Sequence, residues 1–159
     1  MSIKHPIIAI TGSSGAGTSS VKKRFEQIFR REKINPVYIE GDAFHRWNRV
    51  EMREEMKKAA EKGDNHYSHF GPQANLFKDL ETTFRDYSET GGGKTRTYIH
   101  DAGEAEIYGV QPGNFTSWHD FEPGSDLLFY EGLHGAVVTE NVNVAHNKLG
   151  FCYNTVFLQ

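Results

Sequence analysis

The stretch that decides the fold lies near the N-terminus, where residues 7–20 read IIAITGSSGAGTSS. Four apolar residues lead into a run of glycines and serines, which predicts a short buried strand over 6–11 followed by a tight turn. Gly12 and Gly17 bracket four residues, as in the phosphate-binding pattern GxxxxGK[ST], but Thr18 stands where that pattern has lysine. We therefore expect a triphosphate site that obtains its positive charge from elsewhere in the protein.

A helix is predicted directly after this loop, from about residue 17 to residue 31. Its apolar positions repeat at i, i+4, i+7 and i+8, and they are Val21, Phe25, Ile28 and Phe29. Backbone N–H groups of the loop and the helix N-terminus together favour bound phosphate. The expected ATP-binding residues are Gly12, Ser13, Ser14, Gly15, Ala16, Gly17, Thr18, Ser19 and Ser20. Ser19 is also the expected Mg²⁺ ligand, with helix capping as the alternative role.

The pattern of strand, helix and strand continues beyond this helix. Residues 37–40 and 127–130 form two further apolar segments, VYIE and LLFY. A strand that returns to the same sheet through a helix makes a parallel pair with a right-handed crossover. We therefore predict an α/β fold of the P-loop NTPase-like type, with a mostly parallel sheet flanked by helices and with the loops after its strands on one rim.

The middle of the chain is predicted from periodicity. Helical patterns cover residues 50–62 and 76–87, and residues 94–100 alternate as a strand does. Residues 102–126 contain several glycines and prolines, which predict an irregular segment. His66 and His69 lack companion ligands at metal-site spacing, so we interpret them as a packing or substrate-contact feature.

Two carboxylates follow the predicted strands on the same rim as the loop. Asp42 is placed to accept the proton of a hydroxyl that attacks a phosphoryl group, and capping of a following helix is its alternative role. Glu131 ends an apolar strand, where an acid organises magnesium in sites of this kind. His45, Arg46 and Arg49 would surround an anionic substrate, although each arginine alone is equally consistent with ordinary surface charge.

Composition limits the classes of partner. The chain has 159 residues, 37% of them hydrophobic, which suits one folded domain. A formal net charge of −3 gives no basic field, so we expect small-molecule partners rather than nucleic acid or a membrane surface. The single cysteine, Cys152, cannot form an intrachain disulfide, and no segment has the pattern of a signal peptide or membrane span. These features predict a soluble, cytoplasmic protein.

Five segments resemble the bacterial type of phosphoribulokinase, within the wider family of small-molecule P-loop kinases that includes uridine kinase and pantothenate kinase. They read GSSGAGTS at 12–19, EGDAFHR at 40–46, TRTYIH at 95–100, PGNFT at 112–116 and FYEGLHG at 129–135. The loop at 12–19 resembles that family's lysine-free loop. The resemblance spans residues 1 to about 145.

This resemblance implies transfer of the γ-phosphate of ATP to the 1-hydroxyl of ribulose 5-phosphate, a step of Calvin cycle carbon fixation. Asp42 would be the base and Glu131 the acid near magnesium. The residues that would contact the sugar phosphate are His45, Arg49, Arg53, Tyr98 and His100. The full-length family form is expected to be a homo-oligomer. A kinase of nucleosides or of another sugar phosphate, and a non-catalytic nucleotide-binding fragment, stay open as alternatives.

The C-terminal residues depart from the resemblance. Family members continue past the acid strand into another apolar strand and a lid that carries lysine and arginine, and residues 146–159 do not resemble that continuation. We therefore expect a kinase domain over 1–145 and an atypical tail over 146–159, as in a truncated or frame-shifted product with an incomplete sheet. Little or no turnover is expected, because cations that stabilise this transition state are worth ~10³–10⁵ in rate.

Overall fold

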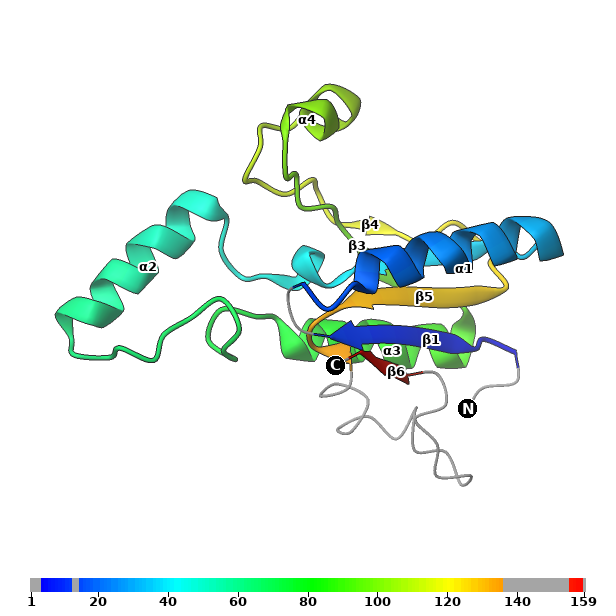
Figure 1. Ribbon diagram of the computed structural model, residues 1–159, viewed down its shortest axis with the longest axis horizontal. Coiled ribbons are helices and arrows are strands. Elements are labelled where there is room, and N and C mark those ends of the chain that lie inside the picture. The colour runs from blue at the N-terminus through cyan, green and yellow to red at the C-terminus, as the bar shows by residue number, and fades with distance from the viewer. Residues whose placement is uncertain (1–3, 13–14, 136–154, 159) are drawn as a thin grey trace.

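A parallel sheet forms the centre of the protein (Figure 1). The computed structural model describes residues 4–12, 15–135 and 155–158, the last of these by backbone alone. The strands of the sheet lie in the order β2-β5-β1-β6 and all pair in parallel. Their bounds are Ile7–Gly12 for β1, Pro36–Glu40 for β2, Leu127–Gly132 for β5 and Thr155–Leu158 for β6. The predicted α/β fold is confirmed, together with the strands expected over 6–11, 37–40 and 127–130.

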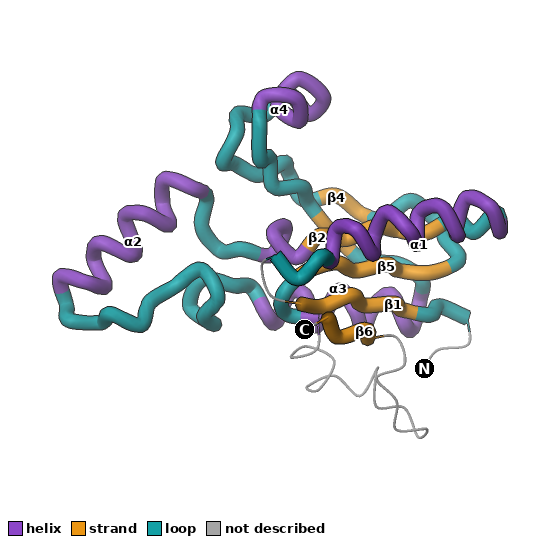
Figure 2. The backbone as a smooth tube through the Cα atoms, in the orientation of Figure 1, coloured by secondary structure: helices purple, strands orange, loops and turns teal. Residues whose placement is uncertain are grey.

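Two helices cover opposite faces of the sheet (Figure 2). Helix α1 (Thr18–Glu32) packs Phe29 against Leu127 and Phe129 of β5. Helix α3 (Phe77–Thr90) lies on the other face, where its buried apolar residues join Leu128 and Tyr130. Because successive strand residues point to opposite faces, the continuous apolar run of β5 serves both layers of the core.

Helix α1 follows its predicted bounds closely but differs at one position of its apolar stripe. Val21, Phe25 and Phe29, spaced at i and i+4, pack against the sheet. Ile28 lies beside this row and is 40% exposed, so its predicted burial was wrong. The sheet contacts one narrow row of the helix, which leaves no room for a wider stripe.

Helix α2 (Arg49–Glu61) projects beyond the carboxyl ends of the strands (Figure 1). It follows a short 3-10 turn, η1 (Gly41–Phe44), that continues directly from β2. Asn48 caps α2 by accepting from the backbone N–H groups of Val50 and Glu51. The predicted helix over 50–62 is confirmed, with its start moved back by one residue.

The segment between α3 and β5 differs from its predicted form. The expected strand over 94–100 is limited to β3 (Lys94–Thr95), which pairs with β4 (His119–Asp120). The chain beyond β3 makes only the isolated bridge of Tyr98 with Phe115, because Arg96 turns inward to the carbonyls of Ala43 and His45.

A short helix, α4 (Ala102–Tyr108), replaces the start of the segment that was predicted to be irregular. Asp101 caps it by accepting from the N–H of Glu104, and Gly109 ends it with a φ of +67°. Gly109 therefore ends a helix, whereas the glycines of this segment were predicted to indicate irregular structure. Helix α4 stands apart from the sheet (Figure 1), and its apolar Ile107 is 77% exposed.

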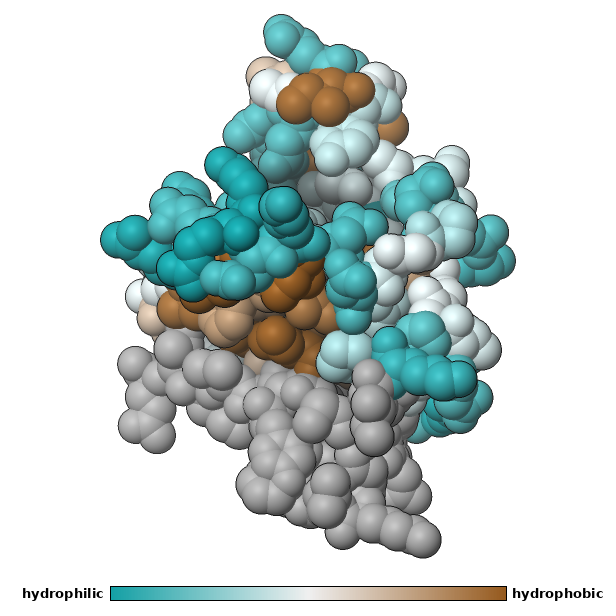
Figure 3. All heavy atoms as spheres, turned by 90° about the vertical axis from the view of Figure 1, so that its right-hand side faces the viewer, coloured by the Kyte–Doolittle hydropathy of each residue, from teal (hydrophilic) through white to brown (hydrophobic). Residues whose placement is uncertain are grey.

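Strand β6 pairs with β1 through residues that the sequence set apart as an atypical tail. The proposed boundary at residue 145 and Cys152 lie outside the described residues. Seen from the end of the molecule away from α2, hydrophilic side chains cover the outer surface and apolar ones show between them (Figure 3). In the described part of the chain, no helix is long and apolar enough to cross a membrane.

The carboxyl end of β5 meets the start of η1 at a close approach of two backbones. A β-carbon at Gly41 would lie 2.6 Å from the hydroxyl oxygen of Tyr130 and 3.1 Å from the Cα of Gly132. A β-carbon at Gly132 would lie 2.6 Å from the same hydroxyl and 2.8 Å from the Cα of Gly41. Only glycine at both positions lets the two strands end side by side over the buried Tyr130.

Substitution of Gly41 tests this steric constraint. Gly41→Ala should lower the free energy of unfolding by about 1–3 kcal/mol, because the added methyl group overpacks a rigid site. In a Tyr130→Phe background the penalty should be smaller by about 1 kcal/mol, since the nearest clashing atom is gone. Urea denaturation measures both values.

Gly103→Ala is the matched control, because a β-carbon there meets only the flexible side chain of Asp101 at 3.3 Å. It should leave stability unchanged or slightly improved. An equal cost for Gly41→Ala with and without the Tyr130 hydroxyl would contradict the steric explanation.

Candidate functional site

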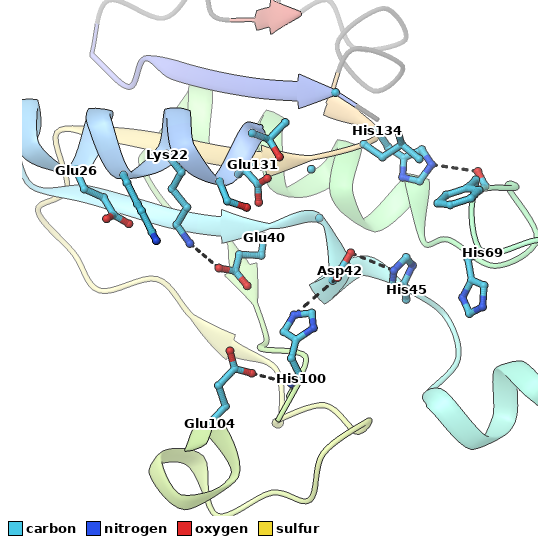
Figure 4. Close-up of a pocket in the computed structure, with 18 residues that line it drawn as sticks. Lys22, Glu26, Glu40, Asp42, His45, His69, His100, Glu104, Glu131 and His134 are labelled. Carbon is cyan, nitrogen blue, oxygen red and sulfur yellow. Dashed lines mark hydrogen bonds and ion pairs between the residues drawn. The ribbon is translucent and has the colours of Figure 1, made fainter. Parts of the chain in front are cut away.

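A cavity of about 610 Å³ opens at the carboxyl ends of β1, β2 and β5 (Figure 4). Its walls come from the start of α1, from the turn η1, from the loop between α2 and α3, and from the residues after β5. This is the rim on which parallel α/β sheets bind their ligands, because all the strands end there.

The N-terminal glycine-rich loop contributes one wall of the cavity. Gly12, Thr18 and Ser19 line the cavity. Gly15 and Gly17 have φ values of +82° and +86°, a left-handed conformation that other residues rarely adopt. Of the remaining expected ATP-binding residues, Gly15, Ala16, Gly17 and Ser20 are outside the lining, and Ser13 and Ser14 lie outside the described residues.

Ser19 and Glu131 line the cavity from neighbouring elements, α1 and β5. A hydroxyl and a carboxylate are oxygen donors of the kind that Mg²⁺ accepts, and such sites complete their coordination with water and substrate phosphates. The donor set therefore fits a magnesium ion bound together with a nucleotide. No group of three or more His, Cys, Asp or Glu within the described residues forms a metal site by itself.

Lys22 brings a cation into the cavity, which the sequence patterns did not single out. It lies one helical turn beyond Thr18, and its Nζ donates to Oε1 of Glu40 at 2.5 Å. Burial alone would lower the pKa of Lys22, but the hydrogen bond and charge of Glu40, with smaller contributions from Glu26 and Glu131, raise it. Spacing of i+4 from the missing loop lysine is the signal that could have identified Lys22.

Asp42 lies between two imidazole rings at the opposite side of the cavity (Figure 4). Its Oδ1 is 3.2 Å from Nε2 of His45, and its Oδ2 is 3.7 Å from Nε2 of His100. The hydrogen bond from His45 lowers the pKa of Asp42, against the opposing effect of burial. Asp42 is therefore an ionised carboxylate that can accept a proton from a group in the cavity.

The electrostatic environment of His45 favours its charged form. Burial lowers the pKa of His45, but the hydrogen bond and charge of Asp42, together with Asn75, outweigh burial and raise it. Asp42 and His45 thus favour each other's charged forms on this side of the cavity.

Two of the expected substrate residues lie behind the cavity wall and support His100. Arg49 donates from Nη2 to the carbonyl oxygen of His100 at 3.1 Å, and its guanidinium lies 6.0 Å from the ring centroid of Tyr98. The rings of Tyr98 and His100 meet edge to face at 4.9 Å. Arg53 is exposed on α2 and is not among the lining residues.

Two other arginines hold the backbone around His45. Arg96 donates to the carbonyl oxygens of Ala43 and His45, while its guanidinium lies 3.6 Å from the ring centroid of Phe115. Arg46, which was a candidate phosphate ligand, instead donates to carbonyl oxygens of Gln73 and Asn75. Both arginines therefore fix the turn that carries the site.

The structure adds two further histidines to the cavity. His69 lines it from the loop between α2 and α3. His134 follows β5, and its Nε2 lies 3.1 Å from the carbonyl oxygen of Phe70, to which the neutral ring can donate. Burial lowers the pKa of His134, which keeps this ring neutral. His69 was predicted as a packing or substrate-contact feature, and its ring lies 6.5 Å from that of His45, centroid to centroid.

Comparisons with known proteins agree with this geometry. A family model described as the phosphoribulokinase / uridine kinase family matches residues 7–150. Phosphoribulokinase from Nitrobacter vulgaris is 64% identical over 142 residues, which cover 89% of this chain and 49% of that protein. Phosphoribulokinase 1 from Cereibacter sphaeroides is 61% identical over 145 residues, covering 91% of this chain and 50% of the relative.

Solved structures show the same relationship. The structure of phosphoribulokinase from Rhodobacter spheroides matches with a TM-score of 0.76 and 56% identity over 90% of this chain and 48% of its own. A possible uridine kinase from Bacillus stearothermophilus shares the fold, with a TM-score of 0.60 at 13% identity over 99% of this chain and 72% of its own.

The chain spans about half the length of the curated relatives it matches. Within that span, the matched region contains the glycine-rich loop, the Asp42 turn and the acid that ends β5. The chain therefore belongs to the phosphoribulokinase / uridine kinase family.

Proposed function

We propose that this protein transfers the γ-phosphate of ATP to the 1-hydroxyl of ribulose 5-phosphate, giving ribulose 1,5-bisphosphate for the Calvin cycle. The observation that carries the proposal is the position of Asp42, an ionised carboxylate in the same cavity as the phosphate loop. Relatives named phosphoribulokinase, 57–64% identical to this chain, support ribulose 5-phosphate as the acceptor.

In the proposed reaction the two sides of the cavity have different tasks. On the nucleotide side, the loop residues and the N-terminus of α1 would bind the triphosphate. Ser19 and Glu131 would hold a magnesium ion, which when bound neutralises charge on the terminal phosphates. On the acceptor side, Asp42 would accept the proton of the attacking hydroxyl and orient its oxygen.

The acceptor needs a second feature, which is recognition of its own phosphate group. His45 and His100 flank Asp42; His45 would contribute positive charge towards that phosphate and His100 a donor, with Arg49, Arg53 and Tyr98 as further proposed contacts. An imidazolium at His45 both attracts a phosphate and keeps Asp42 ionised, because the two charges stabilise each other.

An acceptor comparison with an Asp42→Asn variant tests the reaction. Turnover should be slow, in keeping with the little or no turnover expected from the sequence, and any transfer of labelled phosphate from ATP should go to ribulose 5-phosphate and not to uridine. Asp42→Asn should lower that rate by about 10²–10⁴, because it removes the general base, while ATP affinity stays within about twofold. A radiolabel assay suits this measurement because it detects slow turnover.

Two outcomes would contradict the proposal. Preferential labelling of uridine, with an acceptor affinity that Arg49→Ala leaves unchanged, would assign the site to a nucleoside kinase. ATP binding without phosphoryl transfer, unaffected by Asp42→Asn, would assign the chain to the nucleotide-binding modules.

We also infer that Lys22 provides the positive charge that Thr18 does not. Lys22→Met should weaken binding of ATP by about tenfold, because a charge-assisted hydrogen bond contributes about 1.5–3 kcal/mol. Titration calorimetry measures this affinity. Arg24→Met on α1 is the matched control, since Arg24 is exposed and bonds to Gln27 outside the cavity. Equal ATP affinities for the two variants would show that Lys22 has no such role.

The raised pKa of His45 predicts a pH dependence of acceptor binding. A group whose pKa is raised in the folded protein is charged below that pKa, so its attraction for a phosphate is lost as pH rises through it. Affinity for ribulose 5-phosphate should therefore fall as pH rises through and above the ordinary titration range of histidine. His45→Gln should bind more weakly at low pH and should show a flatter profile, as titration calorimetry across this range can measure. A profile that His45→Gln leaves unchanged would exclude His45 as its origin.

A further inference from the structure

Asn75 is a buried polar side chain to which the proposed reaction assigns no role. It is 3% exposed and lies just before α3, directly behind His45. Its Nδ2 donates to the carbonyl oxygens of His69 and Gly71, at 2.8 and 2.7 Å. Because only the amide nitrogen can donate to two carbonyls, these bonds fix the orientation of the amide and turn Oδ1 towards His45.

The orientation of this amide determines which protons His45 carries. Oδ1 of Asn75 lies 2.8 Å from Nδ1 of His45, and an amide oxygen can only accept a hydrogen bond. The other ring nitrogen, Nε2, faces Oδ1 of Asp42 at 3.2 Å, and an ionised carboxylate also only accepts. In a neutral ring one nitrogen carries a lone pair instead of a proton, so one of these two oxygens would face that lone pair. Only an imidazolium satisfies both.

We propose that Asn75 is a positioning residue that holds His45 as an imidazolium, with its ring plane fixed beside Asp42. This inference rests on the proposed function for its consequence, a positive charge at neutral pH on the side of the cavity proposed to bind the sugar phosphate. Its structural content, the protonation state of His45, does not depend on turnover.

The charged groups around His45 show why the ring needs a second hydrogen-bond acceptor besides Asp42. Asp42 of η1 is the negative group that faces the ring. The guanidinium of Arg96 opposes a positive charge on His45, and the rings of His69, His100 and His134 line the same cavity. Asn75 adds an acceptor without adding a negative charge, so it stabilises the imidazolium and does not repel a phosphate. An aspartate at this position would also stabilise the imidazolium, but its negative charge would repel a phosphate.

Nuclear magnetic resonance of the ring nitrogens in the full chain tests the assignment directly. In the unaltered protein at neutral pH, both nitrogens of His45 should be protonated, with the Nδ1 proton bonded to Asn75. A neutral His45 at neutral pH would overturn the proposal, and this measurement requires no variant and no substrate.

Two substitutions at Asn75 should move the pKa of His45 in opposite directions. Asn75→Ala removes the acceptor, so the pKa should fall by about one unit, a tenfold change in the protonation constant. Asn75→Asp keeps an acceptor and adds negative charge, so the pKa should rise. Both variants lose the two hydrogen bonds to the carbonyl oxygens of His69 and Gly71. If Asn75 had a purely structural role, the pKa of His45 would shift in the same direction in both variants. That result would overturn the proposal.

Arg46→Ala is the matched control for loosening of the same loop. Arg46 donates to carbonyl oxygens of Gln73 and Asn75, and it does not contact the Nδ1 atom of His45. This variant should leave the pKa of His45 unchanged. A shift equal to that of Asn75→Ala would show that loop anchoring, rather than the amide acceptor, sets the charge.

Calorimetry with ribulose 5-phosphate separates this inference from the proposed function. If both hold, Asn75→Asp should bind the sugar phosphate more weakly than the unaltered protein despite its higher pKa at His45. If the ring is an imidazolium but ribulose 5-phosphate does not bind to any form, the acceptor assignment fails and the role of Asn75 stands.

Discussion

The close approach of Gly41 and Gly132 over the hydroxyl of Tyr130 is the constraint on which the site depends. At this point the backbones of β2 and β5 end side by side, with Glu40 in register with Glu131. A side chain at either glycine would separate the strand ends and move Asp42 away from Glu131. Asp42, the proposed general base, and Glu131, the proposed magnesium ligand, therefore share one cavity because glycines stand where the two backbones meet.

The cavity has an uneven charge distribution that suits the proposed phosphoryl transfer from a nucleotide to a hydroxyl of an anionic acceptor. The nucleotide side carries the carboxylates of Glu26, Glu40 and Glu131, with Lys22 among them. A triphosphate entering there would meet repulsion unless a divalent cation accompanied it, which agrees with the proposed use of Mg²⁺. The acceptor side carries imidazoles around Asp42, which favour an anionic acceptor.

The turn that carries Asp42 and His45 is held from several directions by backbone-directed bonds. Arg96 binds the carbonyl oxygens of Ala43 and His45, and the backbone N–H of Leu76 donates to the carbonyl oxygen of Phe44. These hydrogen bonds hold the backbone of the turn in place, and with it the positions of the Asp42 and His45 side chains. Pre-organisation of this kind lowers the cost of reaching a reactive arrangement.

Sequence periodicity predicted the strands and helices that an apolar pattern defines. It failed where contacts between residues distant in the sequence determine the structure. Strands β1, β2 and β5 and helix α1 follow from apolar runs and spacing, because burial on a sheet requires those patterns. The strand expected over 94–100 ends at Thr95, since Arg96 binds carbonyls about fifty residues away. Ile28 is exposed because the sheet meets only one row of α1.

The sequence by itself determined the α/β fold, the glycine-rich loop and the family, because these depend on residue type and short spacing. It also pointed to Asp42 and Glu131, since acids that follow parallel strands meet on one rim. Only the tertiary structure decided that Lys22 enters the cavity, that Arg46 is structural and that Asn75 faces His45. Those contacts join residues whose proximity results from folding, and a hydrogen bond between side chains thirty residues apart leaves no periodic signal in the sequence.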